Sequence, residues 1–147
     1  MKRIILLIVI LFGAVFSQAQ RMDTNDIPQK VRDAFRKDYP TVEFPGWTKF
    51  GDTYITSFAF NGSVTIRYNS DGTLNHLEQS IETNMIPQSA KDYLAKNFPN
   101  DTVQFAYQLK DDKGVITYLT DFSYSDSKKI SKYIFDANGN FIESRSW

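Results

Sequence analysis

The stretch Ile27-Pro28-Gln29 decides how the chain is divided, because it recurs 59 residues later as Ile86-Pro87-Gln88. Each copy opens a short amphipathic segment that closes on an aromatic–proline pair, Tyr39-Pro40 and then Phe98-Pro99. Between residues 27 and 40, six positions are identical to the residue 59 places later. Unrelated windows of this length match at about one position, so the fixed spacing indicates an internal duplication.

Both copies of the opener predict a helix. The apolar residues of the first segment recur at helical spacing on one face, at Ile27, Val31, Ala34, Phe35 and Tyr39. Pro28 suits the first turn, and Asp26 and Gln29 have the spacing of a capping box. The second segment repeats the pattern with Ile86, Ala90, Tyr93, Leu94 and Phe98. Each stripe is narrow, so we expect each helix to lie on a sheet.

After each helix the apolar period changes from 3.6 to 2, which predicts strands. In the first copy a bent edge strand (42–50, with Pro45-Gly46) precedes strands at 54–60, 63–68 and 73–79. In the second copy the predicted strands are 103–110, 115–124, 129–135 and 141–144. Hairpin turns are indicated by Asn61-Gly62 and Asn138-Gly139.

The large aromatic residues that alternate along the long strand of each repeat indicate which face of the sheet is buried. Tyr54, Phe58 and Phe122 are each worth about 1.5–3 kcal/mol when fully buried, far more than the small residues that alternate with them. The sequence therefore predicts an α+β fold of two tandem helix-plus-four-strand antiparallel repeats (26–84 and 85–147). Both helices lie on one face, and a small polar row faces outward.

The N-terminus has the pattern of an export signal. Lys2 and Arg3 precede an apolar run over residues 4–16, and Ser17-Gln18-Ala19 follows as a small-x-small cleavage signal. We predict a signal peptide over residues 1–19, a polar leader over 20–25 and a periplasmic or secreted product with no stable membrane insertion. An uncleaved anchor is the alternative.

Composition excludes several classes of function. Without Lys2 and Arg3 the chain carries 15 basic and 17 acidic residues, a balance unsuited to nucleic acid, which needs a concentrated basic face. There are no cysteines, so disulfides, thiol catalysis and thiolate metal sites are excluded.

The pattern resembles the PepSY-like family of exported bacterial proteins, which is related in structure to the β-lactamase inhibitor proteins. The residues that carry the likeness are the two Ile-Pro-Gln openers, the aromatic–proline stops, Tyr54-x-Thr-x-Phe58, and the turns 68–72 and 135–139. The resemblance implies that the two repeats join side by side into one curved sheet with the helices on one face. It also implies a non-catalytic activity, namely binding or restraining another exported protein. The inhibitors carry disulfides, which this chain cannot form, and their enzyme-blocking loops have no match here.

No residue pattern predicts an enzyme, a metal or a cofactor. His76 is the only histidine, which excludes His-pair zinc motifs within one chain. Asn69-x-Asp71-Gly72 and Asp136-x-Asn138-Gly139 resemble fragments of a calcium loop, but turn chemistry explains both. Asp111-Asp112 is a further turn candidate, and no serine lies in a G-x-S-x-G context.

The predicted site is the outward face of the sheet. Strand parity places Ser57, Thr65 and Arg67 there from the first repeat, with Asp121, Ser123 and Lys132 from the second; Trp47 and Tyr107 are expected at its rim. We interpret this face as a binding surface for an unidentified exported protein or peptide, and the alternative is a merely solvated face. A second functional hypothesis is a carrier or sensor of a small apolar ligand between helices and sheet, suggested by 12 Phe and 8 Tyr.

Overall fold

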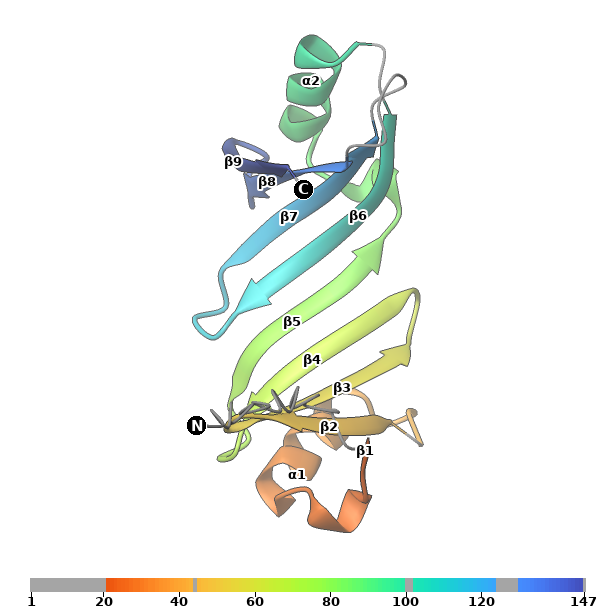
Figure 1. Ribbon diagram of the computed structural model, residues 1–147, viewed down its shortest axis with the longest axis vertical. Coiled ribbons are helices and arrows are strands. Elements are labelled where there is room, and N and C mark those ends of the chain that lie inside the picture. The colour runs from red at the N-terminus through yellow and green to blue at the C-terminus, as the bar shows by residue number, and fades with distance from the viewer. Residues whose placement is uncertain (1–20, 44, 100–101, 124–129, 147) are drawn as a thin grey trace, which may run out of the picture.

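The computed structural model describes residues 21–43, 45–99, 102–123 and 130–146. They form one antiparallel sheet of nine strands in which every strand pairs with its neighbour in sequence, in the order β1 to β9. Figure 1 shows the sheet as a long, strongly twisted ribbon with α1 near one end and α2 near the other. The α+β class and the single sheet are as predicted.

The same order of elements, a 3-10 turn, an α-helix and four strands, occurs twice along the chain. After the two-residue β1 (Arg21–Met22), the first half contains η1 (Thr24–Asp26), α1 (Gln29–Asp38), β2 (Gly46–Phe50), β3 (Thr53–Ala59), β4 (Ser63–Asn69) and β5 (Leu74–Ile81). The second half contains η2 (Thr83–Met85), α2 (Gln88–Asn97), β6 (Thr102–Asp111), β7 (Ile116–Ser123), β8 (Ile130–Asp136) and β9 (Phe141–Ser146).

The helices begin later than the capping-box spacing predicts. Asp26 closes the 3-10 turn η1, and the side chain of Asp23 caps that turn by accepting from Asn25 N at 2.9 Å. Pro28 occupies the N-cap position of α1 without a side-chain cap, and Gln29 donates to Asp33 instead. The predicted capping box is therefore wrong, because a proline at the cap leaves the flanking polar side chains to other partners.

The first core lies between α1 and strands β2 to β5. Val31 and Phe35 of α1 are buried against Trp47, whose ring centroid lies 5.4 Å from that of Phe35 in an edge-on contact. The remaining buried members come from the entry to the helix and from β3 and β4: Ile27, Tyr54, Val64, Ile66 and Tyr68. Phe58 also points inward, with its ring 5.3 Å from Phe35.

The second core repeats this layer under α2 with smaller side chains. Ala90 and Leu94 of α2 are buried together with Ala106 of β6. The other buried members are Ile86, Tyr133 and Phe135. The side chain of Phe122, which was expected to align with Phe58, lies outside the described residues.

Strand β5 shows that both helices cover the same face of the sheet. Leu77 packs against the first core and Ile81 against the second. Residues four apart on a strand point to the same side, so α1 and α2 lie on one face, as predicted. We call the opposite side the outer face.

Candidate functional site: the outer face of the sheet

The outer face begins in the first half with small polar residues. Ser57 of β3 lies directly opposite Thr65 of β4, and their hydroxyl oxygens are 2.9 Å apart. Arg67 is exposed and lies between Ile55 of β3 and His76 of β5. Ser57, Thr65 and Arg67 therefore lie on the outer face of the first half, where strand parity predicts them.

In the second half the predicted charged residues form a pair. Asp121 of β7 lies directly opposite Lys132 of β8, with Lys132 Nζ 3.4 Å from Asp121 Oδ1. The contact has the length of an ion pair, yet Asp121 Oδ1 is buried and accepts no hydrogen bond within the described part of the chain. This oxygen retains the capacity to accept from an incoming donor.

Tyr107 lies in the middle of the outer face and not at its rim. It is on β6, directly opposite Ser80 of β5 on one side and Leu119 of β7 on the other. Burial raises the pKa of its hydroxyl above the usual 10.0, and the Asp121 carboxylate raises it further, while the Lys132 ammonium acts in the opposite direction. The tyrosine, the carboxylate and the ammonium therefore share one electrostatic environment.

The prediction that placed Trp47 at the rim is wrong. Trp47 is only 2% exposed and belongs to the first core, on the face covered by α1. It lies opposite Thr56, which is also buried, so position 47 of β2 faces the side of the sheet that α1 covers. The side chain of Ser123 lies outside the described residues.

Sequence reasoning missed an apolar strip on this face. Tyr107, Leu119 and Ile134 stand side by side across β6, β7 and β8, and Leu109 and Phe105 extend the row along β6. Leu119 is only 9% exposed although no helix covers it, whereas Phe105 is 62% exposed. We call these five residues the apolar strip: Phe105, Tyr107, Leu109, Leu119 and Ile134.

A signal for the strip is present in the sequence. Every second residue from 105 to 109 on β6 is large and apolar or aromatic. These three side chains point to the face opposite that of the small, buried Ala106. The expected small polar row therefore describes the first half of the outer face only. In the second half β6, β7 and β8 carry apolar side chains on both faces.

The described residues offer little for other chemistry. They contain no group of three His, Cys, Asp or Glu side chains placed to hold a metal ion. In the same ranges no helix is long and apolar enough to cross a membrane. Asp71 and Asp136 are used as turn caps: Asp71 accepts from Thr73, and Asp136 accepts from the backbone N–H groups of Asn138 and Asn140.

The fold and this face together define an α+β protein with a long antiparallel sheet whose helices cover one side. No protein-family model matches the sequence, and no curated protein matches it. Among solved structures, a DUF2874 family protein from Bacteroides uniformis has a TM-score of 0.71 at 17% identity, covering 81% of this chain and 88% of that chain.

Two further structures share the fold. A BLIP-like protein from Bacteroides fragilis has a TM-score of 0.66 at 16% identity, covering 81% of this chain and 86% of its own. A protein from Bacteroides eggerthii, provisionally described as periplasmic, has a TM-score of 0.72 at 16% identity, covering 81% and 88% of the two chains. At these identities the comparisons establish the fold alone.

Proposed function

We propose that this chain is an exported, non-catalytic binding module that holds another exported protein or peptide on the outer face of its sheet. The observation that carries the proposal is the apolar strip beside the Asp121–Lys132 pair, on a face that neither helix covers. Cores of protein interfaces combine aromatic and aliphatic anchors with a few polar groups, inside a polar rim.

The polar groups around the strip suit such an interface. Tyr107 supplies a rigid aromatic body with a hydroxyl at its tip, and Asp121 offers an oxygen without a hydrogen-bond partner among the described residues. Ser57, Thr65 and Arg67 continue the face across β3 and β4 as a polar flank. A partner whose N–H group or ammonium donates to Asp121 Oδ1 would give this buried oxygen the hydrogen bond that it lacks among the described residues.

We also infer that the chain arose by duplication and is related to the PepSY-like proteins. The repeated element order, the two Ile-Pro-Gln openers and the matching turns at Gly72 and Gly139 support this inference. The BLIP-like neighbour from Bacteroides fragilis supports kinship at the level of fold. A binding function without catalysis follows from that kinship as a proposal.

Export to the periplasm or beyond is part of the same proposal. The charged start, the apolar run over residues 4–16 and the signal ending at Ala19 support it. The Bacteroides eggerthii neighbour carries a provisional periplasmic description, which agrees with it.

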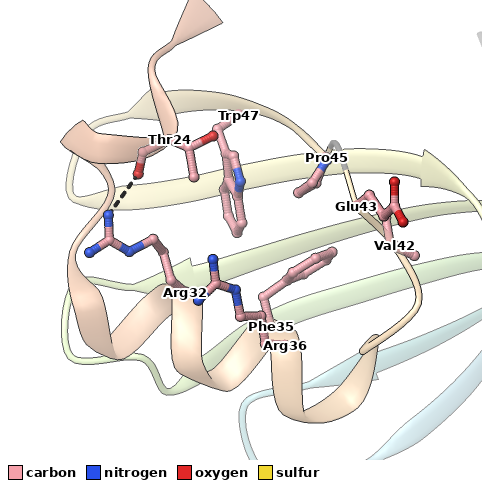
Figure 2. A pocket seen from close by; sticks show the side chains of 8 residues that line it. All are labelled: Thr24, Arg32, Phe35, Arg36, Val42, Glu43, Pro45 and Trp47. Atoms are coloured by element: carbon pink, nitrogen blue, oxygen red, sulfur yellow. Dashed lines mark hydrogen bonds between the residues drawn. The ribbon is translucent and has the colours of Figure 1, made fainter.

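The alternative of a small-ligand carrier gains no support in the first half. The cavity between α1 and the sheet measures about 40 Å³, because Phe35, Trp47 and Arg36 occupy most of the space (Figure 2). Ligand pockets usually measure about 300–1,000 Å³. The corresponding pocket of the second half is larger, at about 340 Å³.

The test is capture from the exported fraction of the cells, followed by mapping of the contact. The wild-type chain and the variants Arg67→Glu, Lys132→Glu and Tyr107→Ala are compared with Lys96→Glu, a charge reversal on the exposed surface of α2. We expect each outer-face variant to weaken capture about tenfold or more, with Lys96→Glu unchanged. Thermal unfolding of every variant checks that the fold is retained.

Hydrogen exchange of the captured complex then locates the partner. Protection on β6, β7 and β8, continuing onto β3 and β4 at the polar flank, supports the proposal. If no outer-face variant alters capture, or if protection appears only on α1 and α2, the assignment of this face is wrong.

A further inference from the structure

The two halves have cavities at corresponding places, each between the helix and the first long strand of its half. Five lining positions of the first cavity recur 59 residues later in the second. They pair Thr24 with Thr83, Arg32 with Lys91, Phe35 with Leu94, Arg36 with Ala95, and Glu43 with Thr102. The first cavity measures about 40 Å³ and the second about 340 Å³.

The difference follows from the size of the side chains. Figure 2 shows the rings of Phe35 and Trp47 projecting into the first cavity. In the second half Leu94 of α2 stands at the position of Phe35 and lines the pocket. Ala106 of β6 stands at the position of Trp47, opposite Thr120, and is not among the lining residues. The helix residue that lines the second pocket is therefore smaller, Leu94 in place of Phe35.

The charge of the two cavities also differs. The first is lined by Arg32 and Arg36 together with Glu43, so cations and an anion face the same space. At the corresponding places the second has Lys91, Ala95 and Thr102, and Lys91 is the one charged residue among the described residues that line it. The rest of the lining is apolar or hydroxylic: Ile86, Leu94, Ala95, Val103, Thr83 and Thr102.

Lys91 has a structural contact but retains donors. Its Nζ donates to Asn84 O at 2.5 Å, much as Arg32 donates to Thr24 O at 3.0 Å in the first half. A lysine ammonium has three donors, so one contact to the η2 turn leaves others for a ligand. Because lysine acts as a single point charge, it matches one negative group and not the forked recognition that arginine provides.

We propose that the cavity between α2 and the start of β6 binds a small carboxylic acid with an apolar body. The carboxylate pairs with Lys91, and the body lies against Ile86, Leu94 and Val103. The volume of about 340 Å³ falls at the lower end of the range for ligand pockets, so the ligand is small. The proposal is independent of the outer face, since Leu94 and Ile86 belong to the helix-covered core.

The experiment titrates octanoate into the full chain and follows methyl signals by NMR, with 1-octanol as the uncharged counterpart. We expect saturable shifts at Ile86, Leu94 and Val103, and no shift at Val31, which lies in the filled core of the first half. Leu94→Phe introduces the residue found at the corresponding position 35 and is expected to abolish the shifts.

Charge variants distinguish the ion pair between Lys91 and the carboxylate from the packing of the apolar body of the ligand. Lys91→Gln is expected to weaken octanoate binding about tenfold while leaving 1-octanol unchanged, and Lys91→Arg restores binding. Arg32→Gln is the matched control in the first half and leaves both ligands unaffected. Circular dichroism of each variant verifies the fold.

Three results would overturn the proposal: no saturable shift with octanoate, equal shifts in both halves, or equal weakening of octanoate and 1-octanol by Lys91→Gln. None of them bears on partner capture by the outer face, because that assay reports on β6 to β8 from the opposite side of the sheet. The two proposals therefore fail or succeed separately.

Discussion

Trp47 and Ala106 hold corresponding positions in the two halves, each directly opposite a buried threonine, Thr56 and Thr120 respectively. The backbone pairing is the same, but one position carries the largest side chain and the other nearly the smallest. The pocket beside α1 measures about 40 Å³, and the pocket between α2 and the start of β6, which opens to solvent, measures about 340 Å³. The same order of elements thus leaves pockets of different size in the two halves.

Replacing Trp47 with alanine should destabilise the protein by about 3–5 kcal/mol, because a 2% exposed ring that contacts Phe35 is lost and a cavity remains. Urea denaturation monitored by circular dichroism measures the change. Phe50→Ala on the same strand is the control, since Phe50 is 70% exposed, and it should change stability by about 0.5 kcal/mol or less. Equal losses in the two variants would contradict the placement of Trp47 in the core.

Gly139→Ala should destabilise the protein more than Gly114→Ala. Both glycines have left-handed backbone, with φ of +85° and +80°, so each substitution costs about 1–2 kcal/mol of backbone strain. At Gly139 an added Cβ would also lie 2.8 Å from Ala90 N on α2, whereas at Gly114 its nearest neighbour is Lys110 Cε at 3.8 Å. Chemical denaturation of both variants compares them, and a larger loss at Gly114 would refute the close packing of the β8–β9 turn against α2.

Thr56→Val should leave stability unchanged or raise it by about 1 kcal/mol. The Thr56 side chain is 1% exposed, and its hydroxyl has no hydrogen-bond partner among the described residues. Valine has the same shape and removes the unsatisfied hydroxyl. Thr65→Val is the contrasting variant, because it breaks the hydroxyl contact with Ser57 on the outer face. A marked loss at Thr56 in thermal unfolding would show that its hydroxyl is satisfied.

The Tyr107 hydroxyl should titrate above its usual pKa of 10.0, chiefly because it is partly buried and next because the Asp121 carboxylate lies near. A tyrosine whose pKa is raised on folding stabilises the native state below pH 10, and that contribution is lost as pH rises through the folded pKa. NMR titration of the ring carbon should show a lower pKa in Asp121→Asn and a higher one in Lys132→Gln. Identical titration curves in both variants would separate Tyr107 from the ion pair.

Mass spectrometry of the exported protein should find a chain beginning at Gln20, because Ala19 ends the predicted cleavage signal. Replacing Ala19 with a bulky residue such as phenylalanine should leave the precursor uncleaved, since the signal requires a small side chain there. Recovery of an exported wild-type chain that still begins at Met1 would contradict the prediction and favour the uncleaved anchor.

The period of the apolar residues predicts most of the fold. Strand parity correctly assigned Tyr54 and Phe58 to the helix side and Ser57, Thr65 and Arg67 to the other. It failed at Trp47, where the Pro45-Gly46 bend hides the parity of the strand. It also failed to identify the apolar strip. The large aromatic residues of each strand indicate the helix-covered face, but Leu119 and Ile134, which alternate with them, make the opposite face of β7 and β8 apolar as well.

By itself, the sequence determined the helices, the strands and the face that each half buries, since these depend on the local spacing of apolar residues. Only the tertiary structure decided that Tyr107 stands beside Leu119 and the Asp121–Lys132 pair, because cross-strand register joins residues far apart in the chain. It alone also decided that the pocket between α2 and β6 is larger than the pocket beside α1. The size of a pocket depends on the combined volume of side chains from several elements, and residues that are neighbours in sequence do not determine that volume.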